Sequence, residues 1–308
     1  MFADAPISLE TIEFAAIKGA EVVLSAIKTR EINTDNYSLT CWKKSDKSLV
    51  SSLDIDSEKV IISLLESHIP CISEERDGVA NFKVPSDWWI SVDPIDGTTS
   101  CVRNLTTRNG QIGFGPLLGL FHGDKLYASV FAHIPERTLF TATLGAGAWA
   151  TPLPDLGEER SQILPLSERL PLKPPTISRN SSKVLSDCAM LGYFGSRIDA
   201  EILGALRETK SIQTFYRFGG LANDCVRVAR GDEDIAFQLQ IKPWDFPSIL
   251  FLHESDHEVV LDPLKTKIPF VDWGVKANNP MIATDKSLIS ELLSKIKDLS
   301  SESFLHTL

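Results

Sequence analysis

The sequence predicts a protein of mixed fold, α+β in its first half and α/β in its second, on three observations. Two stretches, 8–30 and 57–67, repeat apolar residues at helical spacing. Between residues 88 and 144, short apolar runs are separated by turn residues, which is typical of an antiparallel meander. After residue 175, short strand-like runs alternate with helical ones. A chain of 308 residues, 43% of them hydrophobic, is long enough to build two such lobes.

The first two predicted elements are amphipathic helices. In the stretch 8–30, Ser8 suits the capping position and Glu10 lies in the first turn. The second helix, 57–67, is expected to end before Pro70, because the residue that precedes a proline disfavours helical geometry. The stretch 41–52 is too polar to belong to the core.

Four strands are expected next, separated by short turns. They span 88–92, 113–121, 125–133 and 137–144. The stretch 151–175 contains six prolines and has little periodicity, so we expect it to connect two lobes. The division is then an N-terminal α+β lobe, 1–150, and a C-terminal α/β lobe, 176–308.

The second lobe should alternate short strands with helices. Pro247 suits the first position of a helix, and Gly231 closes the helix that precedes it in the chain. The expected elements are a strand starting at 176–178, a helix over 220–230, a strand over 235–241, a helix from Pro247 and a last helix over 287–299.

Charge and cysteine content narrow the possible partners and the compartment. The chain has 41 acidic and 31 basic residues, a net charge of −10, and no basic cluster. We therefore expect neither nucleic acid nor an anionic membrane as a partner. The five cysteines are widely spaced and form no CxxC pair, which favours a reducing compartment. Without a signal-like start or a long apolar run, the protein is expected in the cytoplasm.

The segment WWISVDPIDGTTS carries the main chemical signal. Asp93 and Asp96 flank Pro94 and Ile95 at the end of an apolar strand, so both carboxylates and the Ile95 carbonyl can face one cation. Magnesium prefers such oxygen ligands and leaves positions open for phosphate oxygens. The amides of Gly97–Thr99 would form an anion cradle, especially if a helix starts there. The alternative is that DPIDG is only an acidic turn, since Asp, Pro and Gly are common turn residues.

Other acids favour the metal interpretation. Glu74 in ISEERDG precedes the strand, Asp245 in KPWDF lies in the second lobe, and Asp54 in SSLDIDSEK is a further candidate. With these residues the sequence resembles the inositol monophosphatase superfamily of lithium-sensitive, magnesium-dependent phosphomonoesterases. KSDKSLVSSLD is similar to its mobile-loop motif, SEE to its glutamate motif, DPIDGTT to its signature and KPWDF to its distal Trp-Asp motif. The resemblance implies a layered αβαβα sandwich of the inositol monophosphatase and fructose-1,6-bisphosphatase type.

The resemblance also implies two to three Mg²⁺ ions. It assigns Glu74, Asp93 and the Ile95 carbonyl to one ion, and Asp93, Asp96 and Asp245 to a second. A third, weaker ion would lie near Glu74.

The same resemblance assigns the remaining catalytic roles. The phosphate would lie against the amides of Gly97, Thr98 and Thr99. Water oriented by Thr98, with Asp54 behind it and Glu74 among the catalytic residues, would attack phosphorus in line with the leaving oxygen.

The substrate stays open at this point. In the resembled family the alcohol part would meet the second lobe, here at Gly220, Leu221, Ala222, Gln238 and Lys242. An inositol phosphatase typically has glutamate at the position of Gln238. The KPWD run is similar to histidinol-phosphate phosphatases, whereas SRNS and NNP are similar to 3'-phosphoadenosine 5'-phosphate phosphatases. The expected partner is therefore a small phosphorylated metabolite, and the resemblance also suggests a homodimer.

Two readings from other classes remain. A non-catalytic member would bind metal or a phosphorylated ligand as a scaffold. The run His253–His257 also matches the HExxH zinc motif, which needs both histidines within one helix. A polar helix end is expected there instead, because the apolar turns finish by Leu252 and EVVL reads as a strand.

Overall fold

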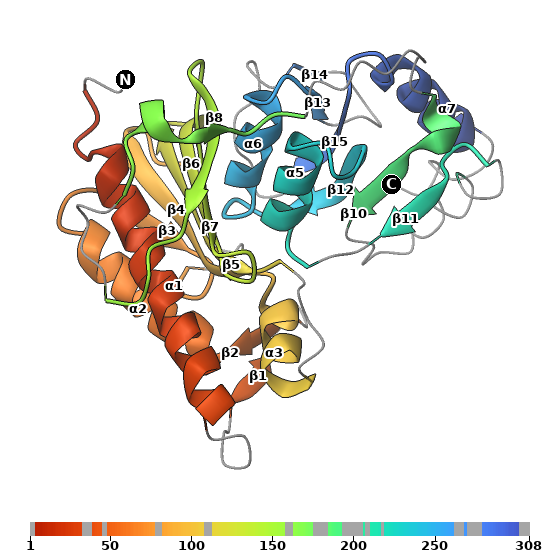
Figure 1. Ribbon diagram of the computed structural model, residues 1–308. Coiled ribbons are helices and arrows are strands. Elements are labelled where there is room, and N and C mark those ends of the chain that lie inside the picture. Colours follow the sequence, from red (N-terminus) through yellow and green to blue (C-terminus); the bar gives the residue numbers. More distant parts are fainter. Residues whose placement is uncertain are drawn as a thin grey trace.

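The computed structural model describes residues 4–32, 39–44, 48–77, 82–107, 113–157, 163–174, 184–192, 206, 210–216, 219–261, 268–269 and 279–301. These residues form two lobes and five layers (Figure 1). The layers are a helix pair, a seven-stranded sheet, a second helix pair, a six-stranded sheet and a last helix. The predicted mixed fold, layered as an αβαβα sandwich, is confirmed.

The first lobe places two helices against a meander. Its elements are α1 (Leu9–Ile32), β1 (Cys41–Lys43), β2 (Leu49–Ser51), α2 (Ser52–Leu65), β3 (Cys71–Ser73), β4 (Trp88–Asp96), α3 (Thr98–Thr107), β5 (Gly115–His122), β6 (Lys125–His133), β7 (Thr138–Thr143), β8 (Gly147–Pro152) and β9 (Leu170–Pro171). The large sheet follows sequence order from β3 to β9, and only β3 and β4 are parallel. The predicted antiparallel meander is therefore confirmed.

The second lobe is a mixed sheet with helices on both faces (Figure 1). Its elements are η4 (Leu185–Asp187), β10 (Ala189–Gly192), β11 (Thr214–Tyr216), α5 (Leu221–Ala229), β12 (Ile235–Ile241), η5 (Phe246–Ser248), α6 (Ile249–His253), β13 (Glu258–Leu261), β14 (Ile268–Pro269), β15 (Asn279–Thr284) and α7 (Ile289–Ser301). The strand order is β11-β10-β12-β15-β13-β14. The helix and strand predicted at 220–230 and 235–241 are confirmed, whereas the strand expected at 176–178 lies outside the described residues.

Two predictions on the early chain were wrong in detail. Helix α2 begins at Ser52 rather than at residue 57, because the Asp54 carboxylate accepts the backbone N–H of Ser51 at 2.8 Å and closes the first turn. The polar stretch before it forms the β1–β2 hairpin. Strand β1 is fully exposed, but Val50 is buried, so only part of this stretch lies outside the core.

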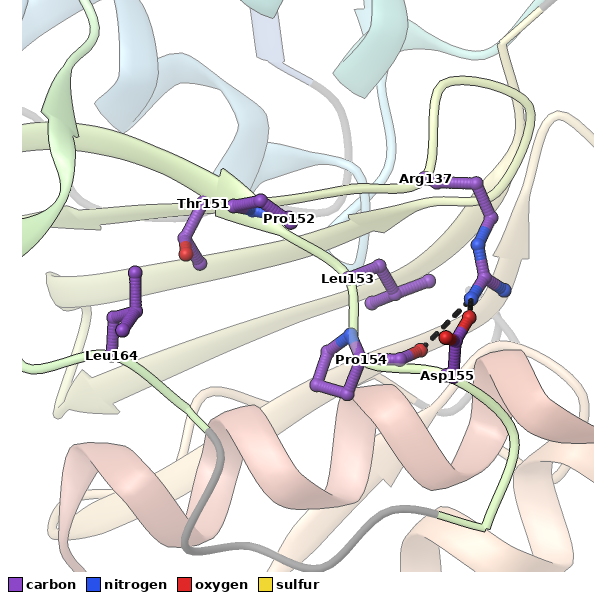
Figure 2. A pocket seen from close by; sticks show the side chains of 7 residues that line it. All are labelled: Arg137, Thr151, Pro152, Leu153, Pro154, Asp155 and Leu164. Carbon is purple, nitrogen blue, oxygen red and sulfur yellow. Dashed lines mark hydrogen bonds and ion pairs between the residues drawn. The ribbon is translucent and has the colours of Figure 1, made fainter.

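The proline-rich stretch at 151–175 remains attached to the first sheet. Strand β8 ends at Pro152, a 3₁₀ turn, η3 (Leu166–Glu168), follows, and β9 then pairs with β8 at the sheet edge. A surface pocket lies along this segment (Figure 2), and Arg137 closes one side of it. The Arg137 guanidinium donates to the Pro154 carbonyl at 3.0 Å and to Asp155 at 2.9 Å.

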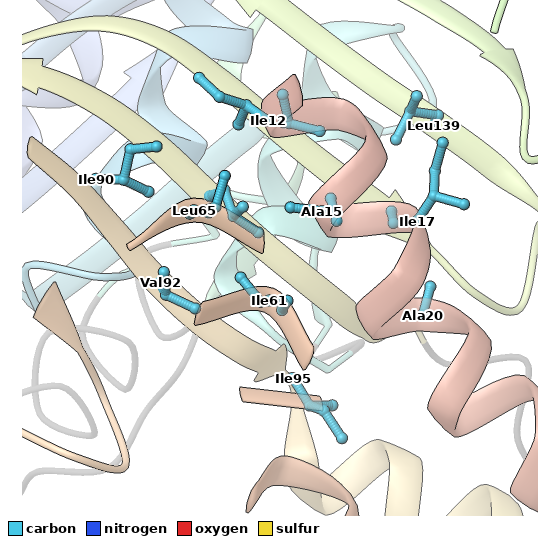
Figure 3. Packing of buried hydrophobic residues seen from close by; sticks show 14 of the residues in the cluster. Ile12, Ala15, Ile17, Ala20, Ile61, Leu65, Ile90, Val92, Ile95 and Leu139 are labelled. Atoms are coloured by element: carbon cyan, nitrogen blue, oxygen red, sulfur yellow. The ribbon is translucent and has the colours of Figure 1, made fainter. Parts of the chain in front are cut away.

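Buried apolar side chains hold the layers together on both faces of the large sheet. Figure 3 shows one cluster, in which Ile12 of α1 and Ile61 of α2 pack near Ile90 and Val92 of β4. The side chain of Trp89, which alternates with Ile90, belongs instead to the cluster shared with α5 and α6. Burial on both faces explains why these strands read as nearly continuous apolar runs. No described helix is both long and apolar enough to cross a membrane.

Candidate metal and phosphate site

Three carboxylates from distant parts of the chain converge between the lobes. Ligand atoms of Glu74, Asp93 and Asp245 all lie within 4.8 Å of one another. Glu74 directly follows β3, Asp93 is in β4, and Asp245 directly precedes η5 of the second lobe. Asp93 is 3% exposed, and the other two are half-buried. The structure thus brings together three of the four side chains that were predicted to hold metal.

A bulge in β4 gives Asp93 and Asp96 the same orientation. Asp93 pairs with Leu117 and Asp96 with Gly115. An advance of three residues along β4 therefore corresponds to an advance of only two along β5. The extra residue returns Asp96 to the face of Asp93, while the Ile95 side chain joins the cluster around α1 and α2. The strand predicted to end at Val92 therefore continues to Asp96, and Pro94 lies at the bulge, where the ladder is interrupted.

Asp96 lies on the same face as Asp93, beside the three acids, but its carboxylate is hydrogen-bonded to the second lobe. Its carboxylate accepts the backbone N–H groups of Leu221 at 3.1 Å and Ala222 at 2.9 Å, at the start of α5. Carboxylates are stabilised at helix N-termini, where N–H groups lack helical partners. Asp96 therefore contacts the predicted substrate-binding amides directly and is not part of the three-acid group among the described residues.

Glycines allow three backbone segments to cross at this point. Gly97 has a φ of 86°, and a Cβ there would come within 2.9 Å of the Gly113 carbonyl and 3.0 Å of the Gly220 nitrogen. A Cβ at Gly220 would overlap the Asp96 carboxylate. Gly113 forms a parallel bridge with Gly219. The start of α5 is thus fixed to the first lobe by close backbone contact.

Asp54 and Thr98 form a polar pair beside the acids. The Thr98 hydroxyl donates to Asp54 Oδ1 at 2.7 Å, and the Ile95 carbonyl lies 3.1 Å from the same hydroxyl. The second Asp54 oxygen accepts both the N–H and the hydroxyl of Ser51, at 2.8 and 2.6 Å. Burial raises the pKa of Asp54, and the bonds from Ser51 and Thr98 partly offset that rise. Asp54 is held rigidly while it faces Thr98.

The residues predicted to form a phosphate cradle lie at the start of α3. The Gly97 carbonyl accepts the N–H groups of Ser100 at 2.8 Å and Cys101 at 3.1 Å, so the helix begins directly after Gly97. The Thr99 side chain is exposed and Thr98 is half-buried. The first N–H groups of this helix have no helical partner, which is the arrangement that binds anions.

Lys44 was not assigned a role from the sequence. Its ammonium donates to Glu74 at 2.8 Å and to Glu75 at 2.7 Å. Burial lowers the pKa of Lys44, but the two glutamates outweigh that effect and raise it. Burial and the neighbouring Glu74 raise the pKa of Glu75 to about 7. No local spacing reveals this pair, because 30 residues separate Lys44 from Glu74.

Without a cation, mutual repulsion and burial make the ionised form of these carboxyl groups unfavourable. Burial raises the pKa of Asp93 well above its usual range, and Glu74, Asp96 and Asp245 raise it further. Burial also raises the pKa of Asp96 to about 7 and that of Asp245 well above normal. Bound protons or a positive ion relieve such repulsion. Because all the donors are oxygens, the group fits a hard divalent cation better than zinc.

One of the predicted substrate residues, Lys242, contacts Asp245. The Lys242 carbonyl accepts the N–H of Asp245 at 3.1 Å and that of Phe246 at 3.0 Å, so it fixes the turn that presents Asp245. The Lys242 side chain is half-buried. Gln238 is buried in β12, opposite Met281 of β15.

Ser51, which anchors Asp54, was also missed, although the Ser-x-x-Asp spacing of a capping box could have identified it.

The HESDH run does not form a zinc site. Helix α6 ends at His253, Asp256 has a φ of 68°, and strand β13 follows. His253 and His257 are therefore not on one helical face. The Glu254 carboxylate instead accepts the N–H groups of Gly145 at 2.8 Å and Gly147 at 2.9 Å, in the β7–β8 hairpin. The predicted polar helix end is confirmed.

Comparisons with known proteins agree with this geometry. The model of the inositol monophosphatase family matches residues 7–254. Nus factor SuhB of Vibrio cholerae is 27% identical over 234 residues, which cover 71% of this chain and 74% of that protein. The chloroplastic phosphatase IMPL1 of Arabidopsis thaliana is 24% identical over 286 residues, or 89% of this chain and 67% of that protein.

The fold is also found among solved structures. Inositol monophosphatase-II of Staphylococcus aureus superimposes with a TM-score of 0.67 at 17% identity, covering 96% of this chain and 97% of that one. Structures of a staphylococcal inositol monophosphatase-II have been solved with inositol monophosphate and with 2'-AMP bound. Because the family model spans most of the sequence, including all of the acids described above, the chain belongs to the inositol monophosphatase family.

Proposed function

We propose that the protein hydrolyses a small phosphate monoester with the help of Mg²⁺. The observation that carries this proposal is the convergence of Glu74, Asp93 and Asp245 within 4.8 Å, next to the Thr98–Asp54 hydrogen bond. A binding module needs the acids alone. The additional pair of Asp54 and Thr98 suits the activation of a water molecule.

Separate groups of residues would bind the metal, activate the water and bind the phosphate. Glu74, Asp93, Asp245 and the Ile95 carbonyl would hold Mg²⁺, with Asp96 close by. When bound, Mg²⁺ would lower the pKa of a water molecule and neutralise charge on the phosphate. The Thr98 hydroxyl, which donates its own proton to Asp54, would accept a hydrogen bond from the attacking water and pass the water's proton on to that carboxylate. The N–H groups at the start of α3 bind the phosphate oxygens.

The identity of the alcohol depends on the second lobe. A neutral amide at Gln238 lacks the charge that a carboxylate offers to polyol hydroxyls, which disfavours inositol phosphate. Lys242 would favour a substrate that carries a second anionic group. Inositol monophosphate, histidinol phosphate and a 3'(2'),5'-bisphosphate nucleotide are the three candidates, and a family member of known structure holds inositol monophosphate or 2'-AMP.

A substrate panel tests the proposal. Phosphate release is measured with the three candidates and fructose 1,6-bisphosphate, with Mg²⁺, with EDTA and with added Li⁺. We expect release from one monoester in Mg²⁺, loss of release in EDTA and inhibition by Li⁺. Absence of release from every monoester in Mg²⁺ would contradict the enzyme proposal.

A second candidate is a non-catalytic role. It is favoured by the Vibrio relative, which is named as a Nus factor rather than as a phosphatase. In that case Mg²⁺ would still bind, but the Asp54→Asn variant would behave as the wild type in every binding assay. Measuring Mg²⁺ binding and phosphate release on the same sample distinguishes the two candidates.

The compartment, partner and oligomeric state are inferred from the cysteine pattern, the charge and the family. We propose a cytoplasmic protein that acts on a small phosphorylated metabolite, as a homodimer. A net charge of −10 without a basic cluster argues against nucleic acid or an anionic membrane as a partner. Light scattering at several protein concentrations tests the dimer.

A further inference from the structure

We infer that His133 and Asn223 form a positioning pair that fixes the start of α5 relative to the catalytic acids, so that it sets substrate affinity without taking part in metal binding. This inference rests on the proposed phosphatase function, because it takes the start of α5 as part of the surface that meets the substrate alcohol. Neither residue belongs to the acid cluster.

The pair connects the two lobes through buried side chains. His133 ends β6 and is 1% exposed, while Asn223 lies in the first turn of α5 and is 2% exposed. His133 Nε2 and Asn223 Oδ1 are 3.1 Å apart, across 90 residues of sequence. A buried polar contact of this kind is directional, unlike apolar packing.

The surroundings fix the roles of donor and acceptor. His133 Nδ1 accepts the backbone N–H of Glu136 at 3.1 Å, so the ring proton lies on Nε2 and is donated to Asn223 Oδ1. The Asn223 amide nitrogen then faces Asp224, 3.4 Å away. Phe131 and Phe140 hold the imidazole edge-on, at 88° and 87°. Burial lowers the pKa of His133, which keeps the ring neutral.

The glycine at position 113 supports this arrangement. A Cβ on Gly113 would overlap the Asn223 amide, so the side chain of Asn223 occupies the space that a larger residue would take. Asn223 is thereby held against the same backbone that bridges to Gly219.

The consequence concerns the amides beside Asn223. Leu221 and Ala222 immediately precede it, and their N–H groups already contact Asp96. Loss of the His133 contact would let this first turn of α5 shift, and the surface that meets the substrate alcohol would shift with it. The acids Glu74, Asp93 and Asp245 lie on other elements and would stay in place.

The test is a double-mutant cycle of His133→Phe and Asn223→Leu, with His122→Phe as the matched control, because His122 is half-exposed on β5. With the substrate that the wild type hydrolyses, each single variant should raise KM by about 10-fold or more with kcat within about 3-fold. The double variant should be no worse than either single variant. Mg²⁺ affinity, measured by calorimetry, should be unchanged.

Unchanged KM in both variants, or a parallel loss of Mg²⁺ affinity, would overturn the inference. Hydrogen exchange at Leu221 and Ala222 gives a readout that needs no substrate. It should be faster in Asn223→Leu than in the wild type and unchanged in His122→Phe. If the wild type hydrolyses nothing, the proposed function fails, whereas unaltered exchange in Asn223→Leu contradicts the positioning pair alone.

Discussion

At the scale of single residues, the proposed function depends on one hydrogen bond. Thr98 donates to Asp54 at 2.7 Å, and Ser51 holds the other Asp54 oxygen. We expect Asp54→Asn to lower kcat by about 10²–10⁴-fold, because an amide cannot accept the proton that this route requires. Mg²⁺ affinity should change little, since Asp54 lies outside the three-acid group.

A neighbouring acid on the same helix serves as the control for this prediction. The Asp56 side chain is 56% exposed and pairs only with Lys59 at the surface among the described ion pairs. Asp56→Asn should keep wild-type kinetics. Full activity in Asp54→Asn, or an equal loss in both variants, would contradict the role given to Asp54.

Titration of the buried acids leads to a prediction on metal affinity. The pKa values of Asp93 and Asp245, two members of the three-acid group, are well above normal, mainly because of burial. Below these pKa values protons compete with the cation, so Mg²⁺ affinity must fall as the pH is lowered. Calorimetry should give an affinity about 10-fold or more weaker at pH 6 than at pH 8. An affinity independent of pH over this range would contradict the raised pKa values.

At the scale of elements, sequence patterns predicted the type of most helices and strands better than their ends. The apolar periodicity of α1 and the nearly continuous apolar run of β6 depend on burial, which single residues encode. The start of α2 depends on a side-chain cap, and the length of β4 on a bulge opposite β5. These are contacts with other residues, and apolar patterns do not contain them.

The residues of the candidate site could likewise be predicted only in part from the sequence. Asp93, Asp96 and Gly97 could be identified from local spacing, because a strand end, a proline and a glycine define a turn. The contact between Asp96 and α5 spans 125 residues, and the Lys44–Glu74 pair spans 30. Such contacts follow from the packing of the lobes, so the sequence did not show that Asp96 would face Leu221 and Ala222.

The end of α6 supports a prediction on stability. Glu254 accepts two hairpin N–H groups, and its side chain is 8% exposed. Glu254→Ala should lower the free energy of unfolding by about 1–3 kcal/mol, because both N–H groups lose a charged acceptor. Urea denaturation measures this loss. The exposed Glu291 of α7 is the control, and Glu291→Ala should stay within about 0.5 kcal/mol of the wild type.

At the scale of the whole molecule, one buried ion pair fastens the first helix to the segment between β8 and β9. Arg169 is 3% exposed and Glu13 is fully buried. Arg169 Nη2 donates to Glu13 at 2.9 Å, and the Thr141 hydroxyl donates to the same carboxylate at 2.6 Å. The Glu13 carboxylate of α1 therefore connects this helix to β7 and to the residue that precedes β9.

Removing one partner of this pair leaves a charge buried alone. Arg169→Met should lower the free energy of unfolding by about 3–5 kcal/mol, measured by urea denaturation. The double variant Glu13→Gln/Arg169→Met should recover part of that loss, because no uncompensated charge remains. A double variant less stable than Arg169→Met would contradict the burial of an unpaired carboxylate as the cause.

The central claim is that acids from both lobes form one Mg²⁺-dependent hydrolytic site. Phosphate release by Asp245→Asn tests it most directly, because Asp245 is the second lobe's member of the three-acid group. Asp256→Asn, an exposed change in the same lobe, is the control. We predict that EDTA abolishes release by the wild type, that Mg²⁺ restores it, and that Asp245→Asn loses at least about 100-fold while Asp256→Asn does not. Full activity of Asp245→Asn, or release that EDTA leaves unchanged, would contradict the claim.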